Sequence, residues 1–313
     1  MKNLNVKIVG LGEGGTRSVS KMMAVGVGKK FSAEFVGVGN DENLLLVSTA
    51  QKNIFLNRDN VTIQKNLSEA LDGAKIIFIV AGTGGSAATK AIPLIMAHAK
   101  KLKAATVAFV NLPSALETKS RRENSFVCLN ELATADALFT VPAEKLFLFR
   151  LNQKEVLLND LFTVADDIFC RGVKNFLATL GAAEKFSNVI KWGNASFCYG
   201  EAEGIDSALE AVKDALKFPT LDLDELKHAP KILVHVTGGD LFFKTTADAA
   251  KKFFKEEISS DAKLMWIVDK DSSIVKKVCA SIVYARPSAV KAENNSAFPS
   301  LKKILDKFST KLG

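Results

Sequence analysis

The sequence predicts an α/β protein in which a doubly wound, mainly parallel sheet is joined by a long central helix to a smaller α+β domain. Three features of the 313-residue chain lead to this prediction. Strand-like and helix-like segments alternate through the first half, one long helical pattern follows, and strands separated by helices fill the final third. Alternation of this kind is typical of parallel strands that are linked by helices.

The first half opens with an apolar run and a glycine-rich turn, and a similar arrangement returns further along. The expected strands are short apolar runs, at residues 5–12, 34–40, 75–82, 105–113 and 137–146. The expected helices repeat apolar residues at three and four positions, at residues 15–26, 66–73 and 90–102. Together these segments predict a first domain over residues 1–158.

The second half begins with a helical pattern from Asn159 to Leu180, which Gly181 is suited to end. The following segments, at residues 204–219, 231–243, 246–258, 263–269 and 280–286, alternate between helical and strand patterns. We therefore expect a connecting helix over residues 159–181 and an α+β domain over residues 182–287. A polar linker and an amphipathic helix are expected over residues 288–313.

Composition favours an ordinary globular protein, with 48% hydrophobic and 24% charged residues. No stretch reaches about 18 uninterrupted apolar residues, so no transmembrane helix is expected. The N-terminal residues enter a strand directly and lack the apolar core of a signal peptide, which favours a cytoplasmic protein. The net charge is +8, but the lysines are scattered among acids, so we expect no nucleic-acid partner. The four cysteines and three histidines show no metal-ligand spacing, and no metal site is predicted.

Two glycine-rich turns are the candidates for a binding site. One is AGTGGSAATKAIP at residues 81–93, which follows an apolar strand and opens into a helix. A strand, a glycine-rich turn and a helix together offer backbone N–H groups to a phosphate. The other is GLGEGG at residues 10–15, which also fits the GxGxxG pattern of dinucleotide enzymes. A dinucleotide enzyme is the weaker alternative. Asp41 lies further beyond the glycine motif than the ribose-binding acid of such enzymes, and no catalytic histidine or cysteine constellation accompanies the motif.

The order of these motifs resembles the tubulin/FtsZ superfamily, and within it FtsZ-type proteins, over residues 5–287. Seven segments carry the resemblance in sequence order: KIVGLGEGGTRSVSKM, FVGVGNDENLL, FIVAGTGGSAATKAIPLIMAHAKK, PSALETKSR, VPAEKL, VADDIF and ILVHVTGGDL. The resemblance implies a GTPase-type first domain, a long central helix and a C-terminal domain that supplies catalytic residues to the nucleotide of the next subunit. In this family GTP lies between the subunits of a filament.

The resemblance also implies which residues contact the nucleotide. In the first two loops they are Gly12, Gly14, Gly15, Arg17 and Asp41. In the signature loop they are Gly82, Gly84, Gly85, Ser86 and Ala87, and Glu117, Arg121 and Asp167 match the family's contacts to ribose, phosphate and guanine. Asn188 stands at a catalytic-loop position.

The chain departs from the family pattern in several loops. Arg17 replaces a base-contacting asparagine, Ala143 replaces another, and Ala88 and Lys90 stand where the signature loop has glycines. We expect the signature loop to have changed shape, because alanine and lysine adopt positive φ only at a cost. Lys90 has three interpretations: a phosphate contact, a surface lysine, or an ion pair with Glu13. The third loop, FLNRDNVTIQKN, contains no glycine.

The catalytic loop is the sharpest departure. The family carries NxDFxD after the long helix, whereas this chain has AAEKFSNV, with Lys185 and Asn188 in place of the two acids. Asparagine can orient a water molecule but cannot act as a carboxylate base. We therefore expect GTP or GDP as a weak ligand or none, Mg²⁺ only together with GTP, and low or no hydrolysis.

The resulting hypothesis is a divergent FtsZ-like cytoskeletal or cell-division protein that associates with itself or with another division protein. The alternative is a working GTPase polymer in which Arg17, Lys90, Glu184 or Asn188 substitute for the lost groups. The C-terminal segment adds a basic amphipathic pattern, with an apolar stripe at Leu301, Ile304, Leu305, Phe308 and Leu312. It predicts a contact with a membrane or an adaptor, or a helix that docks on its own domain.

Overall fold

The computed structural model forms two compact units, one built from residues up to Cys170 and one from Arg171 to Pro287. The structure describes residues 4–146, 158–182, 191–218, 220–239, 244–258, 261–270, 274 and 276–286. The boundary between the units falls inside one long helix, α7 (Leu158–Ala182), which confirms the long helix expected from the sequence. The catalytic loop and the C-terminal amphipathic segment lie outside the described residues.

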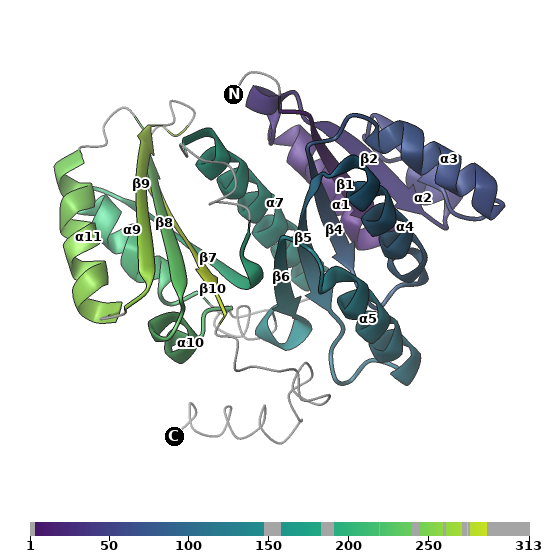
Figure 1. Cartoon of the computed structure of the whole chain (residues 1–313). Helices are drawn as coiled ribbons and strands as arrows, with labels where there is room; N and C mark the ends of the chain where they lie inside the picture. The colour runs from purple at the N-terminus through teal and green to yellow at the C-terminus, as the bar shows by residue number, and fades with distance from the viewer. Residues whose placement is uncertain are drawn as a thin grey trace. The chain divides into compact units, whose positions relative to one another are not determined.

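The first unit contains a parallel sheet, in which the strand order is β3-β2-β1-β4-β5-β6 (Figure 1). The strands are β1 (Val6–Leu11), β2 (Glu34–Gly39), β3 (Lys52–Phe55), β4 (Ile76–Gly82), β5 (Ala105–Leu112) and β6 (Ala137–Pro142). This order runs outward in both directions from the first strand, which confirms the predicted doubly wound arrangement. The four-residue strand β3 was not predicted, because so short a segment shows no clear alternation.

Helices cover both faces of this sheet. They are α1 (Gly12–Ala24), the short 3₁₀ helix η1 (Lys29–Phe31), α2 (Glu42–Leu46), α3 (Asn60–Leu71), α4 (Ser86–Leu102), α5 (Lys119–Leu132) and the first half of α7. Asp41, Asp59 and Thr118 cap α2, α3 and α5 by accepting backbone N–H bonds in the first turn. Helix α3 begins earlier than expected, because Asp59 provides a cap inside the glycine-free third loop.

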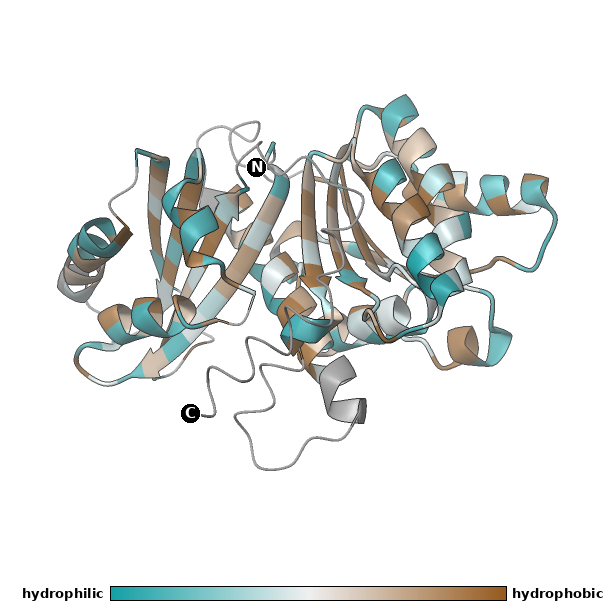
Figure 2. Ribbon diagram, turned by 90° about the horizontal axis from the view of Figure 1, so that it is seen from below, coloured by the Kyte–Doolittle hydropathy of each residue, from teal (hydrophilic) through white to brown (hydrophobic). Residues whose placement is uncertain are grey.

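A hydrophobic core lies between the sheet and the helices α3, α4 and α5. Alternate strand residues such as Val9, Ile79 and Val110 meet Ile92 and Ile95 of α4 there, and all are buried. The opposite face of the sheet packs against α1, with the stacked rings of Phe109 and Phe139 nearby. Figure 2 shows hydrophobic residues concentrated on the strands and hydrophilic residues on the outer parts of the helices.

Helix α1 approaches the sheet so closely that backbone touches backbone. A Cβ atom on Gly15 would lie 2.3 Å from the carbonyl oxygen of Val80, and one on Gly10 would lie 2.3 Å from the carbonyl oxygen of Gly15. Gly12 has a φ of +67°, which favours glycine at the turn from β1 into α1. The glycines of this motif therefore place the N-terminus of α1 directly at the carboxyl end of β1.

The second unit is a four-stranded mixed sheet with helices against it. Its strands are β7 (Gly193–Glu203), β8 (Lys231–Gly238), β9 (Lys263–Lys270) and β10 (Lys277–Ala285), in the order β7-β10-β8-β9. Strand β10 is antiparallel to β7 and β8, and β9 is parallel to β8. This arrangement confirms the smaller α+β domain.

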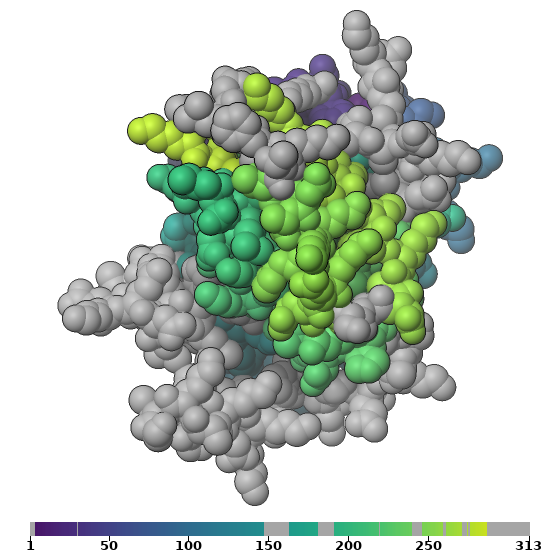
Figure 3. Space-filling view, turned by 90° about the vertical axis from the view of Figure 1, so that its left-hand side faces the viewer, coloured from purple at the N-terminus to yellow at the C-terminus, as the bar shows by residue number. Residues whose placement is uncertain are grey.

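The helices of this unit are α9 (Ser207–Ala215), α10 (Leu223–Lys227) and α11 (Lys244–Ile258). Helix α9 packs closely on β7, where a Cβ on Gly200 would meet the carbonyl oxygen of Ala211 at 2.3 Å. Figure 3 looks onto this unit and shows α11 at the surface. Within the described part of the chain, no helix is both long and apolar enough to cross a membrane.

We predict that Gly15→Ala destabilises the first unit by about 1–3 kcal/mol or more, because the added methyl group has no room between α1 and β4. Gly82→Ala is the matched control, since a Cβ there meets nothing within 4 Å. Urea unfolding followed by circular dichroism measures both. Equal unfolding midpoints for the two variants would show that the close approach is not a constraint.

Candidate functional site

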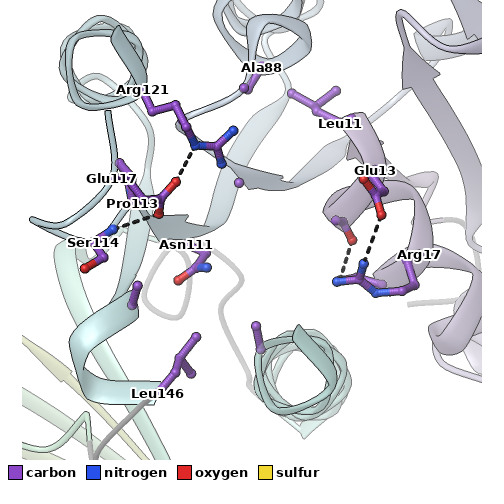
Figure 4. Close-up of a pocket in the computed structure, with 18 of the residues that line it drawn as sticks. Leu11, Glu13, Arg17, Ala88, Asn111, Pro113, Ser114, Glu117, Arg121 and Leu146 are labelled. Atoms are coloured by element: carbon purple, nitrogen blue, oxygen red, sulfur yellow. Dashed lines mark hydrogen bonds and ion pairs between the residues drawn. The ribbon is translucent and has the colours of Figure 1, made fainter. Parts of the chain in front are cut away.

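A pocket of about 620 Å³ lies at the carboxyl ends of the central strands of the first unit (Figure 4). Its walls come from the start of α1, the glycine-rich loop after β4, the loop after β5 and helix α7. Ligands of doubly wound sheets bind outside the carboxyl ends of the strands, so the pocket lies where the topology favours a site. Nine of the predicted contact residues line it: Gly12, Gly14, Arg17, Gly82, Gly84, Gly85, Ala87, Glu117 and Arg121.

The glycine-rich loop forms an end of the pocket suited to an anion. Helix α4 begins at Ser86, and Gly85 precedes it in an extended conformation without a side-chain cap. The first N–H groups of a helix lack partners within the helix and carry partial positive charge. The guanidinium of Arg121, which is paired with Glu117, packs against Gly84, where a Cβ would lie 3.2 Å from Nε.

The loop after β5 is shaped by two neighbouring arginines. Glu117 accepts hydrogen bonds from the backbone N–H of Ser114, at 2.9 Å, and from Arg121 Nε (Figure 4). Arg122 donates to the carbonyl oxygens of Ala115 and Glu117. Arg121 and Glu117 therefore form a pair at the edge of the pocket, and the sequence analysis predicted that both belong to the site.

A buried charge cluster closes another side of the pocket. Arg17 Nε lies 2.6 Å from Asp166 Oδ2, and Ser18 donates its hydroxyl to the same carboxylate. The Asp166 side chain is only 6% exposed, so Arg17 and Ser18 provide the polar contacts that water would otherwise make. Glu13 lies 3.9 Å from Arg17 NH1, and this arginine therefore offsets the acid in the glycine-rich turn.

The other predicted contacts lie outside the lining of this pocket. Asp167 pairs with Lys21 at 2.7 Å, and Asp41 caps α2. Gly15 packs against Val80, and Ser86 accepts a hydrogen bond from Asn40 Nδ2 at 2.9 Å. Asn188 lies outside the described residues. No finding tests the roles assigned to these residues, and those roles remain predictions.

The two non-glycine residues of the signature loop, Ala88 and Lys90, adopt a helical conformation. Ala88 and Lys90 lie inside α4, and neither is among the residues with positive φ in the described chain. Lys90 Nζ donates to the carbonyl oxygen of Leu56 at 2.6 Å, rather than pairing with Glu13. The loop thus ends at Gly85, and the later positions no longer require glycine.

Family models match both units of the chain. The model described as "Tubulin/FtsZ family, GTPase domain" matches residues 60–149, and "FtsZ family, C-terminal domain" matches residues 193–286. Together they cover more than half of the sequence, in the order expected from the motifs. The chain belongs to the tubulin/FtsZ superfamily.

Curated relatives of this superfamily member are cell-division proteins. "Cell division protein FtsZ" of Methanothermobacter thermautotrophicus is 29% identical over 307 residues, which cover 90% of this chain and 78% of the relative. "Cell division protein FtsZ 1" of Archaeoglobus fulgidus is 28% identical over 287 residues, which cover 83% of this chain and 76% of the relative.

Two solved structures share the fold. The empty FtsZ dimer of M. jannaschii has 25% identity and a TM-score of 0.76, covering 92% of this chain and 89% of that one. CetZ2 from Haloferax volcanii, solved as a GTPγS-bound protofilament, has 18% identity and a TM-score of 0.73, covering 97% of this chain and 99% of that one. The second likeness is one of fold alone.

Sequence reasoning missed several residues of the superfamily site. Asn111 ends β5 at the pocket, and its Oδ1 is buried without a hydrogen-bond partner among the described residues. Asp166, Leu146 and Phe169 also line the pocket. A polar residue at the carboxyl end of an apolar parallel strand was the available signal for Asn111. No comparable local signal distinguishes Asp166 from Asp167.

We predict that Asp166→Ala lowers the free energy of unfolding by about 1–3 kcal/mol, because Ser18 and the half-buried Arg17 lose their shared partner. Asp167→Ala is the control from the adjacent position. The Asp167 side chain, which pairs with Lys21, is 44% exposed, against 6% for Asp166, and we therefore expect a loss of about 0–1 kcal/mol. Equilibrium urea unfolding measures the free energy of unfolding of both variants. A larger loss of stability for Asp167→Ala than for Asp166→Ala would contradict the arrangement described.

Proposed function

We propose that this chain is an FtsZ/CetZ-like cytoskeletal protein that binds guanine nucleotide and associates with itself, with weak or absent GTP hydrolysis. One observation carries the proposal: the pocket keeps an anion-binding end, whereas the catalytic loop lacks both family acids. Nucleotide binding would depend on the pocket and GTP hydrolysis on the catalytic loop, so binding can persist without hydrolysis.

The pocket residues support nucleotide binding. The N-terminus of α4 and Arg121 would hold phosphates, and Glu117 would contact ribose, as the family resemblance implies. Leu146 and Phe169 give the pocket apolar walls, which suit a planar base. Arg17 and Asp166 would lie near that base, although Ala143 removes an amide that the family uses there. We propose Mg²⁺ only as the counter-ion of bound GTP.

The catalytic loop supports slow turnover. Lys185 and Asn188 stand where the family positions two carboxylates against the water that attacks the neighbour's GTP. Asn188 can orient that water, but it can neither accept its proton as a carboxylate does nor help to hold a cation. Lys185 adds positive charge where negative charge is expected. The alternative is a working GTPase polymer in which Glu184 or Asn188 takes over the role.

Self-association follows from the same scheme. In the family the catalytic loop acts on the nucleotide of the next subunit, and the relatives with solved structures include a dimer and a protofilament. We propose a cytoplasmic location, with a second copy or another division protein as partner. The basic amphipathic segment over residues 301–312 would supply a membrane or adaptor contact.

Nucleotide occupancy tests the binding half of this proposal. The chain is purified without added nucleotide and denatured, and the supernatant is analysed by chromatography, with GDP and GTP titrations alongside. We expect guanine nucleotide to be released or to bind on titration. Arg121→Ala should weaken GDP binding about tenfold, because a charge-assisted contact to phosphate is lost. No binding at millimolar GTP would overturn this half.

Phosphate release tests the hydrolysis half. We expect turnover near background in the wild-type chain. The double variant Lys185→Asp with Asn188→Asp should raise it by about tenfold or more, since it restores the acids that general-base catalysis uses. A wild-type rate that rises with protein concentration and disappears in Asn188→Ala would instead establish the working GTPase. Sedimentation at the same protein concentrations would report whether polymer accompanies either result.

A further inference from the structure

Helix α5 makes direct polar contacts with the glycine-rich loop from behind the pocket. Asn124 donates its side-chain amide to the carbonyl oxygen of Gly84 at 3.2 Å. One turn further on, the Cys128 thiol donates to the carbonyl oxygen of Thr83 at 3.6 Å. Burial raises the pKa of this thiol, which keeps it protonated as a donor. Two successive loop carbonyls are therefore held by one helix.

The start of α4 holds the next carbonyl. Both the hydroxyl and the backbone N–H of Thr89 donate to the carbonyl oxygen of Gly85, at 3.1 Å and 3.3 Å. Behind the loop, the hydroxyls of Thr83 and Ser125 form a buried hydrogen bond of 2.7 Å. The loop is thus fixed on the side away from the pocket by α5 and along its end by α4.

Fixing a carbonyl also fixes the N–H group of the next residue. In a planar trans peptide the C=O and the N–H point in opposite directions, and the described chain has no cis peptide bond. With the Gly84 carbonyl directed toward Asn124, the Gly85 N–H points away from α5. Gly84 and Gly85 line the pocket, and neither N–H donates a hydrogen bond within the described residues. The Gly85 N–H is therefore presented as a donor on the pocket side.

We propose that Asn124 is a positioning residue that sets the Gly84–Gly85 peptide so that the Gly85 N–H faces the phosphate of a bound nucleotide. The inference rests on the proposed function, since it names the residue that orients one donor of the same site. Asn124 is not among the residues that line the pocket, so it would act through the Gly84–Gly85 peptide. It acts from α5 because the Gly84 carbonyl has no other hydrogen-bond donor in the described chain.

The hydrogen bond from Asn124 to the Gly84 carbonyl oxygen can be removed by a single substitution, unlike the hydrogen bonds that hold Thr83 and Gly85. Thr83 is held by its backbone and by its hydroxyl, and the Gly85 carbonyl is held by two donors. The Gly84 carbonyl depends on one side-chain amide, and glycine on both sides of the peptide permits rotation. Loss of Asn124 therefore frees this peptide to turn while the rest of the loop remains attached.

Isothermal titration of Asn124→Ala with three probes tests the inference. The probes are GDP, inorganic pyrophosphate and guanosine, which separate the phosphate contribution from that of the nucleoside. We expect the variant to bind GDP and pyrophosphate about tenfold more weakly, the effect of one oriented donor, with guanosine affinity unchanged. Asn130→Ala is the matched control, because Asn130 is the same residue type on the same helix and is exposed.

A spectroscopic readout accompanies the titrations. In ¹⁵N-labelled wild-type protein, the Gly85 amide resonance should shift on addition of pyrophosphate, and in Asn124→Ala that shift should be lost or strongly reduced. If the alanine variant does not fold, Asn124→Asp replaces it, because aspartate has nearly the same size but cannot donate to a carbonyl while ionised. The Asp comparison is made at high salt, so that its added charge is screened.

Each outcome separates the inference from the proposed function. Equal affinities of wild type and Asn124→Ala for all three probes would overturn the role of Asn124 and leave nucleotide binding intact. An equal loss for guanosine would also overturn it, because the effect would then be one of general stability. If the wild type binds pyrophosphate but not GDP, the proposal of a guanine nucleotide is overturned. The positioning role of Asn124 is then supported if Asn124→Ala abolishes pyrophosphate binding, and overturned if it does not. A wild type that binds no probe overturns both.

Discussion

The close packing of α1 on the sheet is the constraint on which the site depends. Gly10 and Gly15 let the backbone of α1 touch β1 and β4, and no side chain fits between them. This contact brings the first two turns of α1, with Arg17 and Ser18, to the same edge of the sheet as the loop after β4. Helix α4 packs on the other face and presents its N-terminus at that edge. A pocket forms because two helices from opposite faces begin beside adjacent parallel strands.

The two sides of the pocket differ in their electrostatics. The side formed by Gly84, Gly85 and Arg121 presents the N-terminus of α4, whose first N–H groups favour anions, while the charge of Arg121 is paired with Glu117. On the α1 side, the positive charge of Arg17 is already matched by Asp166. A ligand with phosphates at one end and an uncharged ring at the other suits this division.

The positions of Ala88 and Lys90 do not need the backbone freedom of glycine in this fold. Helix α4 begins at Ser86, so Ala88 and Lys90 adopt ordinary helical conformations and incur no strain from positive φ. The side chain of Lys90 turns to the carbonyl of Leu56, on the segment that replaces the glycine-containing third loop. Ala88 lines the pocket beside Gly82, Gly84 and Gly85, which the sequence retains, whereas Lys90 does not line it.

The sequence by itself determined the alternation of strands and helices, the glycine-rich turns and the long central helix, because hydrophobic periodicity and turn residues are local properties. The resemblance of seven motifs in order indicated the superfamily, whereas the strands β3 and β7 and the helices α2 and α5 were not predicted. The tertiary structure decided which of two adjacent acids meets the pocket. Asp166 and Asp167 differ by one position, about 100° around a helix, and only the packing of α7 selects between them. Burial of Asn111 and the bond from Asn124 to Gly84 likewise depend on segments far apart in the chain. Such contacts form only when the sheet brings its strand ends together, so they cannot be predicted from a local sequence pattern.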